Sequence, residues 1–356
     1  MRRKLRILYV AYPLLAVNEE SCGGAEQVML ALEGEMRRRG HETWVAAPGG
    51  SRVGGKLIPT NQAARKADDL ERCQAEHIAA VSTAIEDANH RGVPFDVVHD
   101  HSSLAWQRAF LSGPPWLVTL HLPRNFYSQQ AFREPGGHLY FSCVSQAQAA
   151  DFRDLPQMLA VVDNAVDTAC FPLCREKSDY LLWLGRICEE KAPHHAVDVA
   201  TMAGMPLVLA GSVYPFSYHQ DYFDRELAPR LLGRPVEMHC ALSRHEKIDL
   251  LARARALLIT STVAETSSLV AMEAMACGTL VIALRSGALP EIVGDGETGY
   301  LADSVEEAAT AVRSLARIDS AACRKRVVEH FSLQRMADNY EQLYWHISTG
   351  RQRLAA

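Results

Sequence analysis

Two glutamates, Glu265 and Glu273, have the types and spacing that best indicate chemistry in this chain. The run Ala256–Thr260 predicts a strand and residues 268–277 predict a helix, so Glu265 lies in the intervening loop and Glu273 within the helix. Free N–H groups at such a helix start stabilise an anion, and carboxylates beside them accept hydrogen bonds from hydroxyl groups. The pattern therefore indicates a ligand that carries both phosphates and sugars.

Two cations follow an earlier predicted strand, in the segment GRICEEK at residues 185–191. Arg186 and Lys191 could neutralise the charge that accumulates on a departing diphosphate; a solvated surface pair is the alternative. The sequence has no Asp-x-Asp metal signature, and Cys170 and Cys174 lack a second pair at metal-ligand spacing. We therefore expect neither a metal nor a cofactor.

Strand and helix patterns alternate twice along the chain, which predicts α/β architecture with two Rossmann-like domains and parallel sheets facing across an interdomain cleft. We expect an acceptor-side domain at residues 1–168, with a helix at about 333–350 packing back on it. A nucleotide-sugar domain is expected at 169–332. The expected strands are Arg6–Ala11, Thr43–Ala47, Phe95–His99, Leu117–Leu120, Leu139–Val144, Tyr180–Leu184, Pro206–Ala210, Ala256–Thr260 and Thr279–Ala283.

The Glu265-x7-Glu273 spacing, with EAMACGT at 273–279 and GALPEIV at 287–293, resembles retaining GT-B glycosyltransferases of family 4. The resemblance implies metal-independent transfer of a hexosyl group from a nucleotide diphosphate sugar, for which we expect UDP, to an acceptor hydroxyl. It implies that Glu273 holds the ribose hydroxyls and that Glu265 contacts the donor sugar. The residues Thr266-Ser267-Ser268 replace the commoner Pro-Phe-Gly, at the point where the family holds that sugar.

The resemblance also assigns other positions. His121 would reach the donor sugar near the reacting carbon, with a structural histidine as the alternative. His101 would line the cleft, again with a structural histidine as the alternative, and Ala192 stands where the family often has glycine. Apart from the resemblance, we expect His101 and Arg124 on the acceptor side. The donor site would comprise Gly23, Gly24, Gly185, Arg186, Lys191, Gly211, Glu265, Ser267, Ser268, Leu269 and Glu273, with His121, Glu265, Arg186 and Lys191 as its catalytic members.

Composition restricts the partners. A net charge of −5 gives no support to a nucleic-acid partner, and Arg37-Arg38-Arg39 indicates at most peripheral membrane contact. With neither a signal peptide nor a spanning segment in the sequence, we expect a cytoplasmic protein. The acceptor is left open among a glycan, a lipid-linked sugar and a small molecule. A nucleotide-sugar epimerase, a phosphorylase-like enzyme and a catalytically silent sugar-nucleotide binder are the alternative functions.

Overall fold

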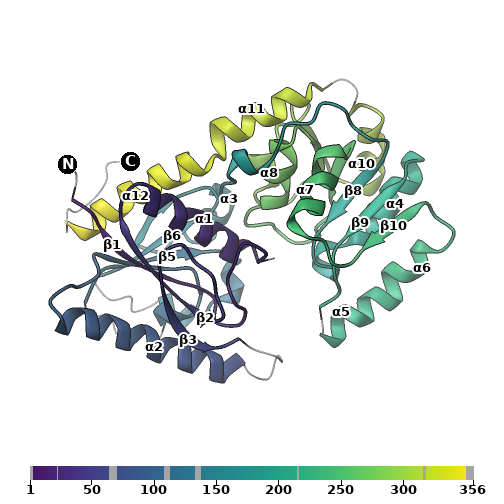
Figure 1. The fold of residues 1–356 in the computed structure, drawn as a ribbon. Coiled ribbons are helices and arrows are strands. Elements are labelled where there is room, and N and C mark those ends of the chain that lie inside the picture. The colour runs from purple at the N-terminus through teal and green to yellow at the C-terminus, as the bar shows by residue number, and fades with distance from the viewer. Residues whose placement is uncertain are drawn as a thin grey trace. The chain divides into compact units, whose positions relative to one another are not determined.

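The computed structural model describes residues 3–21, 23–63, 70–107, 113–132, 138–214, 216–315 and 318–349. The chain divides into two compact units (Figure 1). Unit 1 comprises Met1–Asn164 together with Leu333–Ala356, and unit 2 comprises Ala165–Ser332. The division after Asn164 lies close to residue 168, where the sequence placed it.

Unit 1 is built on a seven-stranded parallel sheet with the order β3-β2-β1-β4-β5-β6-β7. Its central strands are short apolar runs that are buried on both faces, as the strands of a helix-covered parallel sheet must be. Helices follow the strands as crossover connections. The strands are β1 (Arg6–Val10), β2 (Glu42–Gly49), β3 (Lys56–Gln62), β4 (Val97–Asp100), β5 (Trp116–Leu120), β6 (Leu139–Cys143) and β7 (Met158–Val161). The helices are α1 (Gly24–Arg38), α2 (Leu70–His90), α3 (Gln146–Ala150) and α12 (Leu333–Ser348). Short helical turns occur at Ala105–Gln107, Arg124–Phe126 and Gln129–Phe132.

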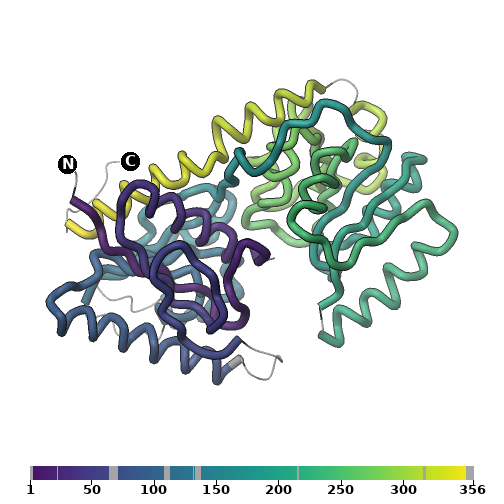
Figure 2. The backbone as a smooth tube through the Cα atoms, in the orientation of Figure 1, coloured from purple at the N-terminus to yellow at the C-terminus, as the bar shows by residue number. Residues whose placement is uncertain are grey.

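Helix α12 packs on unit 1 although it follows unit 2 in the sequence. In Figure 2 this yellow C-terminal helix runs beside the purple first helix, α1. Arg39, which ends α1, pairs with Asp338 and Glu341 of α12 at 2.7 Å each. One face of α12 is buried, and its residues recur at helical spacing: Met336, Tyr340, Leu343, Tyr344 and Ile347. Residue 350, the expected end of this helix, lies outside the described residues.

Unit 2 is built on a six-stranded parallel sheet with the order β10-β9-β8-β11-β12-β13. Its strands are β8 (Leu181–Leu184), β9 (Leu207–Ala210), β10 (Val236–His239), β11 (Ala256–Ile259), β12 (Leu280–Leu284) and β13 (Gly299–Ala302). The helices are α4 (Pro193–Ala203), α5 (Ser217–Tyr222), α6 (Ala228–Leu231), α7 (Arg244–Arg253), α8 (Leu269–Ala276), α9 (Leu289–Ile292), α10 (Val305–Val312) and α11 (Ser320–His330), with short turns at Thr168–Cys170, Glu189–Lys191 and Phe223–Leu227.

Both sheets reverse their strand order at one point, between β1 and β4 in unit 1 and between β8 and β11 in unit 2. The carboxyl ends of strands at such a switch point form a crevice that commonly binds ligands. The predicted pair of Rossmann-like parallel sheets is therefore confirmed, and each unit has one place where a site is expected.

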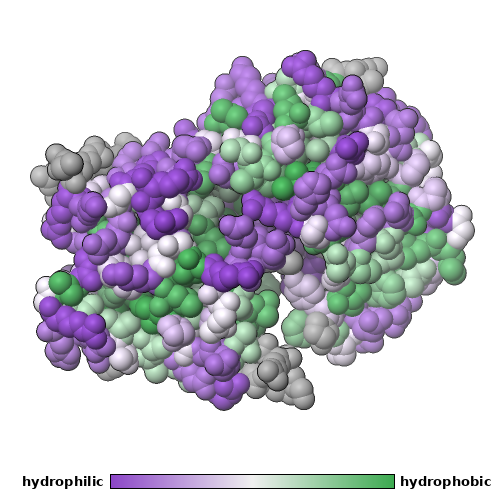
Figure 3. All heavy atoms as spheres, in the orientation of Figure 1, coloured by the Kyte–Doolittle hydropathy of each residue, from purple (hydrophilic) through white to green (hydrophobic). Residues whose placement is uncertain are grey.

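Among the residues that the structure describes, each helix is too short or too polar to cross a lipid bilayer. On the face shown in Figure 3, hydrophilic residues are spread widely, with hydrophobic residues between them.

Candidate functional site

In unit 2, the loop at residues 260–268 joins the buried strand β11 to α8 at the carboxyl edge of the sheet. Ser268 precedes the helix with an extended backbone (φ −141°), but its side chain does not cap the first turn. The hydroxyl of Ser267 is buried without a hydrogen-bond partner among the described residues. A buried polar atom without a partner costs free energy, so this hydroxyl is a candidate contact for a polar ligand group.

Glu265 is held firmly within this loop. Its Oε1 lies 2.5 Å from Nζ of Lys191 and accepts a hydrogen bond from the Ser261 hydroxyl. The Glu265 carbonyl accepts a hydrogen bond from the Ala288 N–H at 2.7 Å. Gly287 (φ +51°) packs so closely that a Cβ there would lie 2.2 Å from the same carbonyl oxygen, so only glycine fits. The carboxylate therefore has a fixed position.

Glu273 lies in the second turn of α8 and is almost fully buried, with 4% of its surface exposed. Its Oε1 accepts a hydrogen bond from Nζ of Lys247 at 2.7 Å. Lys247 comes from α7, and sequence reasoning missed it because a lysine in a polar helix has the pattern of an ordinary surface charge. Each of the two glutamates is thus paired with a lysine from a different element.

The segment after β8 carries Arg186 and Lys191. The Arg186 guanidinium lies over the ring of Tyr214, 5.7 Å from its centroid, and Lys191 ends the short turn Glu189–Lys191. The segment after β8 passes very close to the end of β9. A Cβ on Gly211 would lie only 1.9 Å from the carbonyl oxygen of Gly185. Gly211 therefore allows the close backbone packing beside the segment that carries the two cations.

Ala192 adopts a left-handed conformation, with φ 43° and ψ 55°. An L-residue with a Cβ pays about 1–2 kcal/mol for this region, so the alanine that replaces the commoner glycine is a strained position. Its carbonyl accepts a hydrogen bond from the Thr260 hydroxyl at 2.8 Å, which ties the cation-bearing segment to the end of β11.

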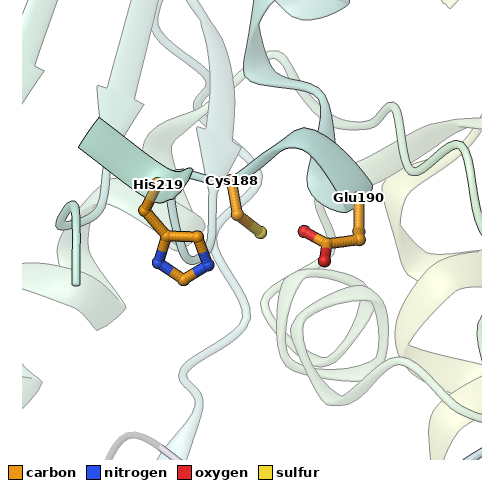
Figure 4. Close-up of side chains that lie close together, drawn as sticks. All are labelled: Cys188, Glu190 and His219. Carbon is orange, nitrogen blue, oxygen red and sulfur yellow. The ribbon is translucent and has the colours of Figure 1, made fainter. Parts of the chain in front are cut away.

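Cys188, Glu190 and His219 form one cluster that could hold a metal ion, with ligand atoms all within 4.8 Å of one another. In Figure 4 the His219 ring and the Glu190 carboxylate flank the Cys188 sulfur. Burial raises the pKa of the Cys188 thiol, and its hydrogen bond to Glu190 raises that pKa further. The Cys188 thiol also donates a hydrogen bond to the carbonyl oxygen of Arg186 at 3.5 Å, and a metal ion would have to displace the thiol proton to bind at this cluster.

In unit 1, three histidines lie in contact at the carboxyl ends of β4 and β5. Nε2 of the partly buried His121 is 2.9 Å from Nδ1 of His101, whose Nε2 is 3.3 Å from Nδ1 of His99. Burial lowers the pKa of His121 to about 4 and lowers the pKa values of His99 and His101 strongly. All three imidazoles are therefore neutral at pH 7. The structure brings the predicted residues His101 and His121 together and adds His99.

The aspartate between these histidines has a structural role. Asp100 accepts hydrogen bonds from the backbone N–H groups of Ser102 at 2.6 Å and Trp106 at 2.8 Å, and so fixes the loop after β4. Its burial raises the pKa of the carboxyl group to about 6.

The other predicted site residues of unit 1 are Gly23, Gly24 and Arg124. Gly23 precedes α1, Gly24 begins it, and the nearby carboxylate of Glu26 has its pKa raised by burial. Both terminal nitrogens of Arg124 donate hydrogen bonds to the Asp154 carboxylate, and Nη2 lies 2.8 Å from Oδ2. The Arg124 charge is thus already paired, at the rim of an open hollow of about 460 Å³.

Two family models match the chain, one on each unit. The model described as Glycosyltransferase Family 4 matches residues 22–169, and the model described as Glycosyl transferases group 1 matches residues 172–329. The two models together span most of the sequence.

Similar proteins agree with these models. A glycogen synthase of Mycobacterium tuberculosis is 30% identical over 52% of this chain, and the chain spans only 48% of that relative's length. A D-inositol 3-phosphate glycosyltransferase of Mycobacterium marinum is 25% identical over 99% of this chain and 88% of its own. Among solved structures, AviGT4, a glycosyltransferase involved in avilamycin A biosynthesis, matches with a TM-score of 0.72 at 25% identity, covering 97% of this chain and 98% of its own.

Proposed function

Because the chain belongs to the Glycosyl transferases group 1 family and has its GT-B fold, we propose that it transfers a hexosyl group from a nucleotide diphosphate sugar to an acceptor hydroxyl. The observation that carries the proposal is the pair of lysine-bound glutamates, Glu265 and Glu273, on either side of the first turn of α8. The comparisons favour neither the epimerase nor the silent binder.

The residues of unit 2 suit the parts of such a donor. In this proposal Glu273 would accept hydrogen bonds from the ribose hydroxyls, and the amide groups of Ser268 and Leu269 would bind phosphate oxygens. Arg186 and Lys191 supply positive charge for the diphosphate. The unpartnered hydroxyl of Ser267 would donate to, or accept from, a polar group of the donor sugar.

Lys191 would act both when the donor binds and when the diphosphate leaves. In this structure its ammonium group is paired with Glu265 at 2.5 Å. A diphosphate at this position would compete for the ammonium group, which would free Glu265 to accept hydrogen bonds from the sugar. As the sugar–phosphate bond breaks, Arg186 and Lys191 stabilise the charge that develops on the leaving diphosphate.

The proposed stereochemical course is retention. It follows from the family resemblance, with the acceptor attacking the face from which the diphosphate leaves and the departing phosphate helping to remove the acceptor's proton. His121 would contact the donor sugar near the reacting carbon. We further propose that the nucleotide is UDP, and that the acceptor is a glycan, a lipid-linked sugar or a small molecule.

The proposed reaction needs neither a metal nor a cofactor. Two fixed cations and the N-terminus of α8 supply the charge stabilisation that a divalent ion would otherwise give.

A nucleotide-binding screen tests the proposal. UDP, GDP, ADP and TDP and their sugar conjugates are compared by calorimetry and by thermal shift on the full chain. We expect selective stabilisation by one nucleotide that disappears in Lys191→Ala and persists in Lys325→Ala, a control at an exposed lysine of α11. If no nucleotide stabilises the protein, the donor-site assignment is wrong. If an isomeric nucleotide sugar forms without any acceptor, the epimerase is correct.

A further inference from the structure

The hydrogen bonds to the Glu265 carboxylate converge on one of its two oxygens. Nζ of Lys191 lies 2.5 Å from Oε1, and the hydroxyl of Ser261 donates a hydrogen bond to the same atom. Among the residues that the structure describes, no side chain or backbone N–H donates to Oε2. Each carboxylate oxygen has room for about two hydrogen bonds. Oε1 is therefore fully used within the protein, and Oε2 is the oxygen that is left for a ligand.

Ser261 donates this bond from a fixed backbone. It lies just after β11 and is almost completely buried. On one side of it, the Thr260 hydroxyl donates to the carbonyl oxygen of Ala192 at 2.8 Å. On the other side, the N–H group of Thr262 donates to the carbonyl oxygen of Glu190 at 3.0 Å. The backbone around Ser261 is thus tied to the cation-bearing segment, and its short side chain has few positions to choose from.

The two partners of Oε1 differ in how they would respond to a bound diphosphate. Lys191 is a cation on a flexible stem whose side chain is 32% exposed, so an anionic diphosphate would attract it. The hydroxyl of Ser261 is neutral and buried, and a diphosphate gives it no reason to move. The Glu265 side chain is only 10% exposed, and a poorly hydrated carboxylate needs hydrogen bonds to stay charged in place. Ser261 is the partner that remains when Lys191 turns to the diphosphate.

We propose that Ser261 is a positioning residue, which holds Oε1 of Glu265 so that Oε2 accepts hydrogen bonds from the donor sugar while Lys191 binds the diphosphate. The role in sugar binding rests on the proposed function, in which Glu265 contacts the sugar. The hold of Ser261 on Glu265 is a property of the protein alone and does not depend on that function.

Crystal structures of two variants of the full chain test this hold without any substrate. In Lys191→Met the cation is removed, and we expect Glu265 to keep its conformation with Oε1 bound to the Ser261 hydroxyl. In the double variant Lys191→Met/Ser261→Ala both partners are removed, and we expect the Glu265 side chain to adopt a different conformation. A displaced Glu265 in Lys191→Met, or an unchanged Glu265 in the double variant, overturns the proposal.

Calorimetry tests the role in sugar binding, with UDP and UDP-glucose as the probes. UDP has no sugar for Glu265 to contact, so any effect of Ser261→Ala on Lys191 or on the diphosphate changes both affinities and cancels in their ratio. Weaker positioning of a charged acceptor should lower the ratio of the UDP dissociation constant to the UDP-glucose dissociation constant by about tenfold. An unchanged ratio would refute the role of Ser261 in holding Glu265 for the sugar.

Ser261→Thr and Thr262→Ala are the matched controls. Ser261→Thr keeps the hydroxyl group and should keep the ratio of dissociation constants within about threefold of the wild type. Thr262 is the exposed neighbour, and its hydroxyl lies 3.5 Å from the carbonyl oxygens of Glu189 and Glu190; its variant should behave as the wild type. A tenfold change in Thr262→Ala, or in a Ser261→Thr protein with the wild-type Tm, would mean that loop packing sets the effect, which overturns the proposal.

Kinetics separate the proposal from the proposed function. Ser261→Ala should lower kcat/KM for the donor by about tenfold or more, with thermal unfolding as the check on stability. An unchanged kcat/KM would refute the role of Ser261 in transfer. If the wild-type protein binds neither UDP nor UDP-glucose, the proposed donor is wrong, and the two crystal structures still decide whether Ser261 holds Glu265.

Discussion

The ion pair between Lys247 and Glu273 should contribute to stability separately from the role of Glu273 in nucleotide binding. The Glu273 side chain is 5% exposed and that of Lys247 is 22% exposed, with 2.7 Å between Nζ and Oε1. The perturbation is the set Lys247→Met, Glu273→Gln and the double variant. Both single changes keep the approximate shape of the side chain but remove one of the two charges.

The burial of the two side chains sets the size of the expected loss in the free energy of unfolding. Removing one partner of a fully buried pair costs about 3–5 kcal/mol, and a hydrogen bond to a charged group is worth about 1.5–3 kcal/mol. Because Lys247 reaches solvent in part, we expect Lys247→Met to lower the free energy of unfolding by about 2 kcal/mol. For a unit of this size, that corresponds to a decrease in Tm of about 4–8 °C. The double variant should lose about 1.5 kcal/mol less than the sum of the single variants.

Nucleotide affinity should follow a different pattern. Glu273→Gln and the double variant both lose the charged acceptor for the ribose, which should weaken binding by about 1.5–3 kcal/mol, or roughly 10-fold to 150-fold. Lys247→Met keeps that acceptor and should stay within a few-fold of the wild type. Adding Lys247→Met to Glu273→Gln should therefore cost only about 0.5 kcal/mol of further stability and leave the affinity at that of Glu273→Gln.

Chemical denaturation and calorimetry measure the two quantities on the same samples. The exposed pair Asp249–Arg253 on the same helix is the control, and its double-mutant cycle should show a much smaller coupling. Additive stabilities for Lys247 and Glu273, within about 0.5 kcal/mol, would refute the ion-pair argument. An unchanged affinity in Glu273→Gln would remove this residue from the ribose site.

Three further predictions concern packing, metals and pH. Gly211→Ala should abolish nucleotide binding and strongly destabilise the protein, because its Cβ would lie 1.9 Å from the carbonyl oxygen of Gly185; a wild-type Tm would contradict this. Transfer activity should persist in excess EDTA, and a loss that Mg²⁺ reverses would refute metal independence. Since burial lowers the pKa of His121 to about 4 and those of His99 and His101 strongly, the unfolded chain binds these protons first as the pH falls below about 6.5. Stability should thus be complete above pH 6.5 and decrease towards pH 4, and a flat denaturation profile between pH 7 and 4.5 would contradict this.

The sequence predicted the inner strands of both sheets and missed the outer ones. All nine expected strands occur, in the interior of one sheet or the other. The strands that were not expected are β3, β7, β10 and β13, and each is at an edge of its sheet. An inner parallel strand is covered on both faces and must be a continuous apolar run, whereas β3 and β10 are largely half-buried or exposed and contain polar residues. These two edge strands therefore lack the pattern by which inner strands are recognised, whereas β7 (MLAV) and β13 (GYLA) are short apolar runs that were not predicted as strands.

The candidate site shows a similar division. The residues at the donor loop could be predicted because their motif is continuous along the chain, from Glu265 to Glu273. Lys247 could not be predicted, because it meets Glu273 only through tertiary packing. The strained backbone of Ala192 was also not evident, since an alanine in a glycine position indicates nothing about φ until the loop is built.

The place of α12 in the sequence has a consequence for biosynthesis. Unit 2 is continuous along the chain, whereas unit 1 needs residues from both sides of it. During translation the strands of unit 1 emerge first, but the buried face of α12 that covers them is made after all of unit 2. Until then, Tyr9 and His99 lack the tyrosine that completes their hydrogen bonds. A released chain that ends before residue 333 should therefore contain all of unit 2 but a unit 1 whose sheet lacks the covering face of α12.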